Sequence, residues 1–318
     1  MPLVNEPGRG PLFGVASFSV FGNSSPLCYS ENAYENTIEE AICAEQSGID
    51  FFGVSEGYSR SVLGLDPFDV VLDIGKRTTT LNMCTSIGKI ATEDLEPRHE
   101  QLHTLIDATD GRVELVLDRD RFIIGNHTDV TETDPEFNSN LDEWCRITAD
   151  CHIQPTWIEV SGRSDAILQA VRYRIPIMLQ VNSGDPLEQK PFTDLYRMAN
   201  TRFGQAHNPL GLLAPGIIAP TDEEARSRAF DPWSHNLGST TSDREKYDRF
   251  LHEVEDGALF VGSPETVARK IATTVETLGL DRFYLRYTCG LHPHEDSLEC
   301  IRLYGTEVIP RVRQLLGV

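Results

Sequence analysis

Short β-rich runs alternate with amphipathic helical patterns along almost the whole chain, and this alternation limits the fold more than any other feature. When a helix separates two strands, it carries the chain back across the sheet, so the strands pair in parallel. We expect eight strands, at residues 12–21, 50–55, 80–87, 112–118, 156–160, 176–181, 210–219 and 281–287. Eight such units predict a closed (β/α)8 TIM barrel in preference to an open sheet.

The 318 residues contain no break in composition that would separate a second domain, so we expect one domain over residues 1–318. Residues 230–257 depart from the alternating pattern. They are rich in Asp, Ser, His, Gly and Thr, and they are too numerous for a routine connection. We expect an insertion or a mobile lid there, after the seventh strand, and a disordered surface segment is the alternative.

Charge and hydropathy exclude several classes of partner. The net charge of −21 argues against binding to nucleic acid or to an anionic membrane, because both depend on basic surface. No run of about 18 apolar residues predicts a membrane span, and the N-terminus lacks the pattern of a signal peptide. The seven cysteines are scattered without a Cys-x-x-Cys pair, which indicates reduced thiols. We therefore expect a cytoplasmic protein.

The turn at residues 161–165, Ser-Gly-Arg-Ser-Asp, follows a strand and opens a helix. Ser164 or Asp165 can cap this helix, the free amides of its first turn point into the turn, and Arg163 adds a positive charge. Arg119 follows the neighbouring strand. Two guanidinium groups that face one mouth in an acidic protein form a clamp for a phosphate. In the alternative, both arginines pair with neighbouring aspartates.

The active site of a TIM barrel lies at the carboxyl ends of its strands. This rule selects a set of polar residues that directly follow or end the expected strands. They are Glu56 and Tyr58, Thr85 and Ser86, Asp118, Arg119 and Arg121, the turn at 161–165, and residues 286–288.

These residues resemble the corresponding positions of the bacterial luciferase-like flavin monooxygenases, which are TIM barrels that bind FMN or, in a sister branch, a deazaflavin. The segments that carry the resemblance keep the family's order across nearly the whole chain: 52–56, 81–86, 111–115, 157–179, 221–225, 262–267 and 306–310. The resemblance implies a monooxygenase that uses reduced FMN and O2 to oxidise a small organic substrate. A deazaflavin-dependent hydride-transfer oxidoreductase and a flavin-binding protein without catalysis are the alternatives.

The resemblance also implies roles for particular residues. It places Arg119, Gly162, Arg163, Ser164 and Asp165 at the flavin phosphate, and Thr85, Ser86 and Ile87 at the flavin ring. The bond between Ser86 and Ile87 falls where the family has a non-prolyl cis peptide beneath the ring. Residues 230–257 correspond to the mobile loop that shields the flavin.

The chain also departs from the family. It has Glu56-Gly57-Tyr58 where luciferase has Glu-His-His, so the histidine base is absent and the aldehyde chemistry is not transferred. Glu56 or Tyr58 is then the candidate acid or base, and Tyr58 is equally suited to packing against the ring. At the phosphate loop, Gly162-Arg163 replaces a Glu-Ser pair.

Some expectations about partners and metals rest on motifs that the chain lacks. Without a Rossmann glycine pattern or a P-loop, reducing equivalents are expected as free reduced flavin from a separate flavin reductase. Luciferase-like barrels often form dimers, so the resemblance is compatible with a homodimer. The spacing of His292, His294 and Glu295 matches none of the usual ligand patterns, so we expect no metal site. Cys289 is expected to be a buried, inert thiol.

Overall fold

The structure is a computed structural model of the chain, and it describes residues 10–17, 32–55, 63–87, 95–117, 135–148, 156–160, 164–204, 208–235, 241–287 and 293–318. Within these residues, eight parallel strands form a closed ring: β1 (Leu12–Ser17), β2 (Phe51–Ser55), β3 (Asn82–Ile87), β4 (Val113–Leu117), β5 (Thr156–Val160), β6 (Ile177–Gln180), β7 (Leu210–Ile218) and β9 (Arg282–Arg286). The ring closes because β1 pairs with β9 and β6 pairs with β7. The TIM barrel prediction is confirmed, and β9 is the predicted eighth strand.

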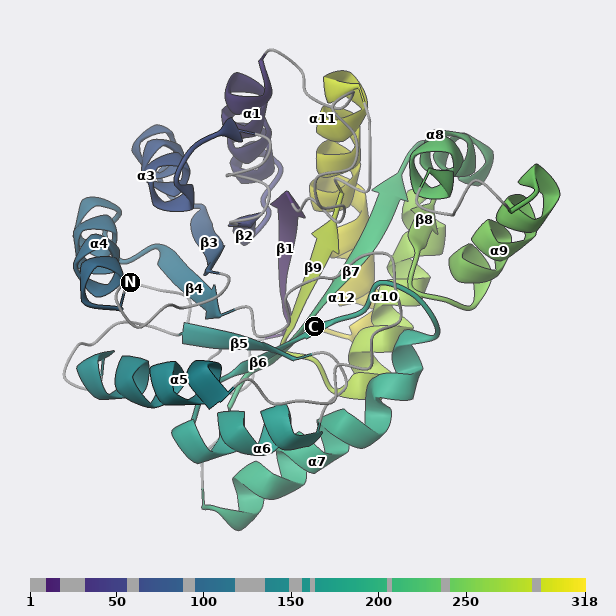
Figure 1. The fold of residues 1–318 in the computed structure, drawn as a ribbon. Helices are drawn as coiled ribbons and strands as arrows, with labels where there is room; N and C mark the ends of the chain where they lie inside the picture. The colour runs from purple at the N-terminus through teal and green to yellow at the C-terminus, as the bar shows by residue number, and fades with distance from the viewer. Residues whose placement is uncertain are drawn as a thin grey trace.

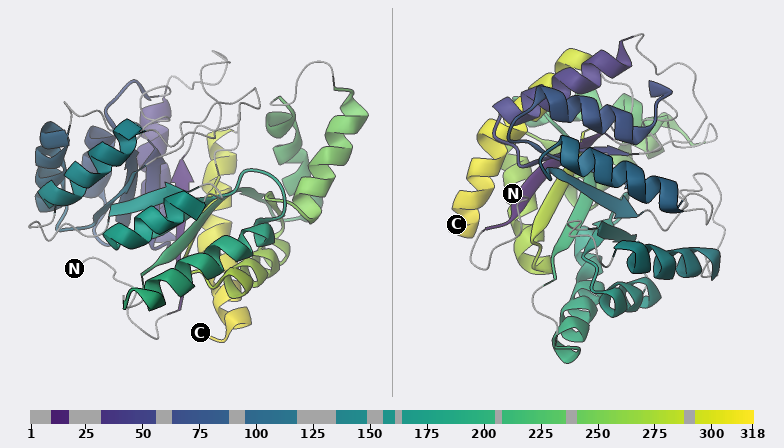
Figure 2. Two further views of the ribbon diagram at one scale, coloured as in Figure 1. Left: turned by 60° about the horizontal axis from the view of Figure 1, so that its bottom comes forward. Right: turned by 90° about the vertical axis from the view of Figure 1, so that its left-hand side faces the viewer.

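Helices cover the outside of the ring on every side that Figures 1 and 2 show. They are α1 (Ala33–Gln46), α3 (Pro67–Arg77), α4 (Leu95–Ala108), α5 (Pro135–Thr148), α6 (Ser164–Tyr173), α7 (Lys190–Arg202), α10 (Pro264–Leu278), α11 (His294–Leu303) and α12 (Ile309–Leu316), with a 3-10 turn at Pro186–Gln189 and a π-helical turn at Tyr304–Val308. Their ends follow local rules: Asp66 caps α3 through a 3.0 Å bond from the Phe68 amide, and Gly279 ends α10 in the left-handed conformation. None of the described helices is long and apolar enough to cross a membrane.

Strand alternation divides the buried residues into two groups. Successive side chains of a strand point to opposite faces, so Val113, Leu115 and Leu117 of β4 join the large core between strands and helices. Val116, between them, joins a second cluster inside the barrel, together with residues of the other strands. The position of a residue in its strand therefore decides whether it packs under a helix or faces the barrel interior.

At the amino-terminal end of the barrel, aspartate side chains link neighbouring strands to one another. Asp50, just before β2, accepts a 2.9 Å hydrogen bond from the Phe13 amide of β1 and lies 3.2 Å from the Arg313 guanidinium of α12. Asp281, just before β9, accepts a 2.8 Å bond from the Leu210 amide of β7 and pairs with Arg197 at 2.6 Å. These contacts join strands that are far apart in sequence, and they leave the opposite end for a site.

The segment after β7 is an insertion that folds into helices. It comprises α8 (Asp222–Ser234), α9 (Asp243–Glu255) and the short strand β8 (Phe260–Gly262), which pairs with the end of β7 outside the ring. Figure 1 shows α8 and α9 beside β8, at one edge of the molecule. The expectation of an insertion after the seventh strand is correct, and the alternative of a disordered segment at 230–257 is wrong for its described part. Phe250 and Val254 of α9 pack into a separate apolar cluster with residues of β7, α8 and β8, which orders the helix.

Candidate functional site

A pocket opens inside the barrel, toward the carboxyl ends of the strands. All eight strands of the ring contribute to its lining, which consists of Ala16, Gly53, Val54, Cys84, Ser86, Val116, Glu159, Met178, Leu213 and Tyr284. Its empty volume is about 350 Å³, including the part that is open to solvent. These residues lie in the middle or toward the end of their strands, so the pocket faces the side on which TIM barrels carry their active sites.

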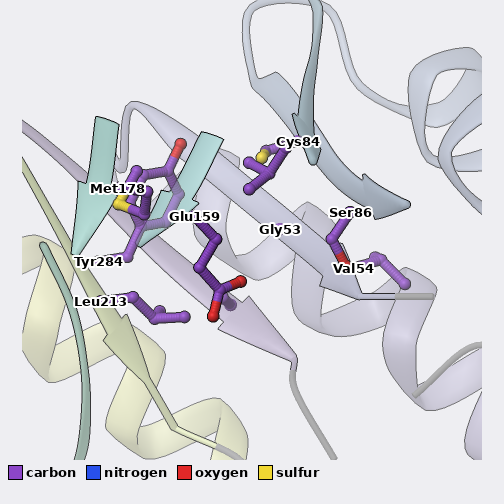
Figure 3. A pocket seen from close by; sticks show the side chains of 10 residues that line it. Gly53, Val54, Cys84, Ser86, Glu159, Met178, Leu213 and Tyr284 are labelled. Carbon is purple, nitrogen blue, oxygen red and sulfur yellow. The ribbon is translucent and has the colours of Figure 1, made fainter. Parts of the chain in front are cut away.

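One wall of the pocket is almost bare backbone. Ala16 and Gly53 are register partners on β1 and β2, and a Cβ atom added to Gly53 would lie 3.1 Å from the Cβ of Ala16. In Figure 3, the larger side chains of Met178, Leu213 and Tyr284 lie on the other side of Glu159 from Gly53. The inner part of the pocket therefore lies between a wall of small residues and an apolar wall, and the backbone of β1 and β2 comes close to it.

A buried ion pair lies one layer below the pocket. The Arg282 guanidinium bonds to the Glu114 carboxylate, with Nη2 3.3 Å from Oε1, and Trp157 donates to Glu114 Oε2 at 3.0 Å. The guanidinium carbon of Arg282 also lies 3.9 Å from the centre of the Phe51 ring and 4.5 Å from that of Trp157. Burial alone would lower the pKa of Arg282, but the Glu114 charge raises it well above its usual value, so the guanidinium stays protonated.

The thiol and the phenol in the pocket are both held protonated. Burial, together with the charge of Glu114, raises the pKa of Cys84 to about 12. Burial also raises the pKa of Tyr284 well above 10. Neither group can act as a nucleophile or base near neutral pH. Of the described residues that line the pocket, Glu159 alone carries a carboxylate.

No protein-family model matches the sequence, and no curated protein matches it in sequence. Solved structures do match. Monooxygenase RslO1 from Streptomyces bottropensis has a TM-score of 0.75 at 19% identity, over 94% of this chain and 99% of that one. The oxygenating constituent of 3,6-diketocamphane monooxygenase from Pseudomonas putida, in complex with FMN, has a TM-score of 0.70 at 14% identity, over 95% and 99% of the two chains. The coenzyme F420 dependent tetrahydromethanopterin reductase from Methanopyrus kandleri has a TM-score of 0.70 at 11% identity, over 96% and 100%. The chain therefore shares its TIM-barrel fold with these three enzymes.

The TIM-barrel fold brings only some of the predicted ring-binding residues into the pocket. Ser86 lines it. Thr85 alternates to the opposite face of β3, where its hydroxyl donates a 3.0 Å bond to the Val54 carbonyl. Ile87 ends β3 and pairs with Leu117 of β4. The described residues contain no cis peptide bond, so the expectation of one between Ser86 and Ile87 is wrong: the strand continues there in regular register.

The predicted phosphate site lies only partly within the described residues. Ser164 and Asp165 begin α6, immediately after the strand that carries Glu159. The other residues predicted at the phosphate, Arg119, Gly162 and Arg163, lie outside the described residues, as do Glu56 and Tyr58. Their roles stay predictions.

The sequence did reveal one signal that the prediction did not use. Glu114, Glu159 and Arg282 are charged residues inside otherwise apolar strands. Such residues face either the barrel interior or a helix, and only the register of the ring decides between these two faces. The structure places all three in the interior: Glu159 lines the pocket, and Glu114 and Arg282 form the ion pair below it.

His294 belongs to a network behind the barrel wall. Its Nδ1 lies 3.1 Å from Glu40 and its Nε2 lies 3.1 Å from Glu39, both on α1. Glu40 also accepts a 2.6 Å bond from Tyr287, whose hydroxyl lies 3.3 Å from that of Ser17. The hydrogen bond to Glu40 raises the pKa of His294 to about 9. The ring is therefore protonated at neutral pH and cannot donate a lone pair to a metal.

Proposed function

We propose that the protein is a flavin-dependent monooxygenase that uses reduced FMN and O2 to oxidise a small organic substrate. The observation that carries this proposal is the pocket toward the carboxyl end of the barrel, where the small residues Ala16 and Gly53 bring the backbone of β1 and β2 close to an otherwise apolar lining. Two structures with the same fold support it by their own descriptions, one as a monooxygenase and one as an oxygenating constituent in complex with FMN.

We place the ring part of the flavin at the mouth of this pocket, where the space opens to solvent. A side chain at position 53 would project toward Ala16 and fill the pocket, so glycine keeps the wall flat enough for a ring. Ser86 of β3, the strand next to β2, adds a hydroxyl to the lining of the pocket. We assign the phosphate to the start of α6, with Ser164 and Asp165, and to Arg119, Gly162 and Arg163 from the neighbouring loops.

The chain contributes orientation and the exclusion of water. Bound reduced FMN supplies the electrons that O2 chemistry requires, and a separate flavin reductase supplies the reduced FMN. The apolar side chains of Val116, Met178 and Leu213 keep the inner part of the pocket dry. Glu56 or Tyr58, which follow β2, serve as acid or base at the rim in this proposal.

Titration with FMN tests the cofactor site. Arg119→Ala and Arg163→Ala should each weaken FMN binding about tenfold to a hundredfold, since each removes a charge-assisted hydrogen bond to phosphate. Arg172→Ala, which removes an exposed arginine from the far end of α6, is the matched control and should leave the affinity unchanged. Equal FMN affinity in all three variants and the unaltered protein would contradict the phosphate clamp.

A deazaflavin-dependent hydride transfer is the second candidate, because the F420 dependent reductase shares this fold over the whole of its own chain. Absorbance spectra of the protein titrated with FMN and with coenzyme F420 separate the two cofactors. Oxygen uptake with reduced FMN then separates an oxygenase from a binding protein. A rate equal to that of free reduced FMN in buffer would reduce the proposal to a non-catalytic flavin-binding protein.

A further inference from the structure

The pocket inside the barrel is too small for a flavin ring or an organic substrate. The space that the centre of a water-sized molecule can occupy in it is about 20 Å³. On this measure a cavity needs about 10–15 Å³ to hold one water molecule. The pocket therefore has room for one molecule of a few atoms, below the mouth at which we place the flavin ring.

Small residues on three adjacent strands account for this space. Ala16 of β1, Gly53 of β2 and Cys84 of β3 are register partners, and all three line the pocket. The interior of a TIM barrel is ordinarily filled by layers of bulky, branched side chains, so three small residues side by side leave their layer incomplete. Figure 3 shows Gly53 and Cys84 on one side of the pocket and Met178 and Leu213 on the other.

The surface of this space is apolar. Ser86, Glu159 and Tyr284 belong to the lining, but none of the described residues exposes a polar atom to the space itself. Burial keeps the thiol of Cys84 protonated, so it adds no charge there. A water molecule inside a protein needs about two to four polar partners, whereas an apolar molecule needs none. The pocket therefore favours a small apolar molecule over water.

We propose that the pocket is a binding site for molecular oxygen. The identity of the gas rests on the proposed function, in which O2 is the reactant that is both apolar and of this size. With the flavin ring at the mouth, O2 in the pocket lies between the ring and the Glu114–Arg282 ion pair, away from bulk water. A deazaflavin-dependent hydride transfer consumes no O2, so this site belongs to an oxygenase.

Xenon tests the site without the cofactor, because this apolar atom binds in dry cavities of proteins. Dissolved xenon is titrated into the full chain without FMN, and xenon NMR measures its binding. Val116→Leu adds a methylene group to the lining, so we expect xenon binding to weaken about tenfold. Val116→Ala enlarges the space and should bind xenon at least as tightly as the unaltered protein.

Val113→Leu is the matched control. It makes the same change on the same strand, but Val113 packs in the core between strands and helices, so xenon binding should stay unchanged. Urea denaturation shows which variants are folded. Absence of xenon binding to the unaltered protein, or equal binding in folded Val116→Leu, would overturn the site. If Val116→Leu does not fold, weaker xenon binding in Val116→Ala would overturn it instead.

Oxidation of bound reduced FMN tests whether the gas is O2. Without substrate, reduced FMN passes two electrons and two protons to O2, which yields oxidised FMN and hydrogen peroxide. In stopped-flow mixing with dissolved O2, Val116→Leu should react about threefold to tenfold more slowly than the unaltered protein and Val113→Leu. An equal rate in Val116→Leu would overturn the assignment to O2. If FMN failed to bind, the proposed function would fall and this assignment with it, whereas the xenon titration would still decide whether the gas site exists.

Discussion

The Glu114–Arg282 pair is the residue-scale feature with the largest energetic consequence. Both side chains are at most 3% exposed, so removing one charge leaves the other buried without its partner. We expect Glu114→Gln to destabilise the protein by about 3–5 kcal/mol. The double variant Glu114→Gln with Arg282→Met should recover part of this loss. Urea denaturation of both variants measures the two effects, and a double variant less stable than Glu114→Gln alone would contradict the pairing argument.

The pH dependence of stability tests the His294 network. Its pKa is about 9 in the folded protein, chiefly because of the bond to Glu40, against an ordinary value of 6.5. Folding therefore favours the protonated ring: the contribution is complete below pH 6.5 and is lost as the pH rises through 9. We expect His294→Gln to cost about 2 kcal/mol at pH 6 and much less at pH 10. Urea denaturation of the unaltered protein and of His294→Gln, at pH 6 and at pH 10, measures the loss of stability at each pH. Titrating groups that the substitution leaves unchanged cancel in this comparison. Equal losses at the two pH values would contradict the proposed role of the His294 network.

Residues at strand ends could be predicted, whereas residues inside the barrel could not. Ser86 follows from the rule that TIM barrel sites lie at the carboxyl ends of strands, and the structure places it in the pocket. Thr85 was predicted beside it but faces the other way, because a sequence position does not reveal which face of a strand it occupies. Glu159 was missed for the same reason.

At the scale of elements, apolar strands were easier to predict than polar helices. Each strand of the ring is short and almost wholly buried, so its apolar run marks it in the sequence. Helix α9 is charged on most faces and buries only Phe250 and Val254, so its periodic signal is weak. Strand β8 has three residues, too few for a pattern.

The capping box of α9 allows this helix to be tested by itself. Ser242 and Glu245 exchange hydrogen bonds at 3.0 and 3.3 Å, which satisfies two amides at the start of the helix. We expect Ser242→Ala to cost about 1 kcal/mol and to speed amide exchange in α9 more than in α10. Ser242→Asp, which keeps a cap, should restore protection. Equal acceleration in both helices would show that α9 does not open independently of the barrel.

For the whole molecule, the two ends of the barrel divide stability and binding between them. The amino-terminal end is held by carboxylates, such as Asp281, that bind strand amides and arginines. The carboxyl end holds the pocket, whose shape depends on the small residues Ala16 and Gly53. Substitutions at the two ends should therefore affect different properties of the protein.

This division predicts opposite effects for two substitutions. Asp281→Ala leaves the Leu210 amide and the Arg197 guanidinium without this partner, so we expect a loss of about 2–3 kcal/mol in stability and unchanged FMN affinity. Gly53→Val places two methyl groups in the pocket, so we expect FMN binding to weaken more than tenfold, with a stability cost of about 1 kcal/mol from crowding against Ala16. Urea denaturation and FMN titration of both variants measure the four quantities. If Gly53→Val bound FMN as tightly as the unaltered protein, the ring could not lie against this wall, and the cofactor would have to be placed elsewhere at the mouth of the barrel.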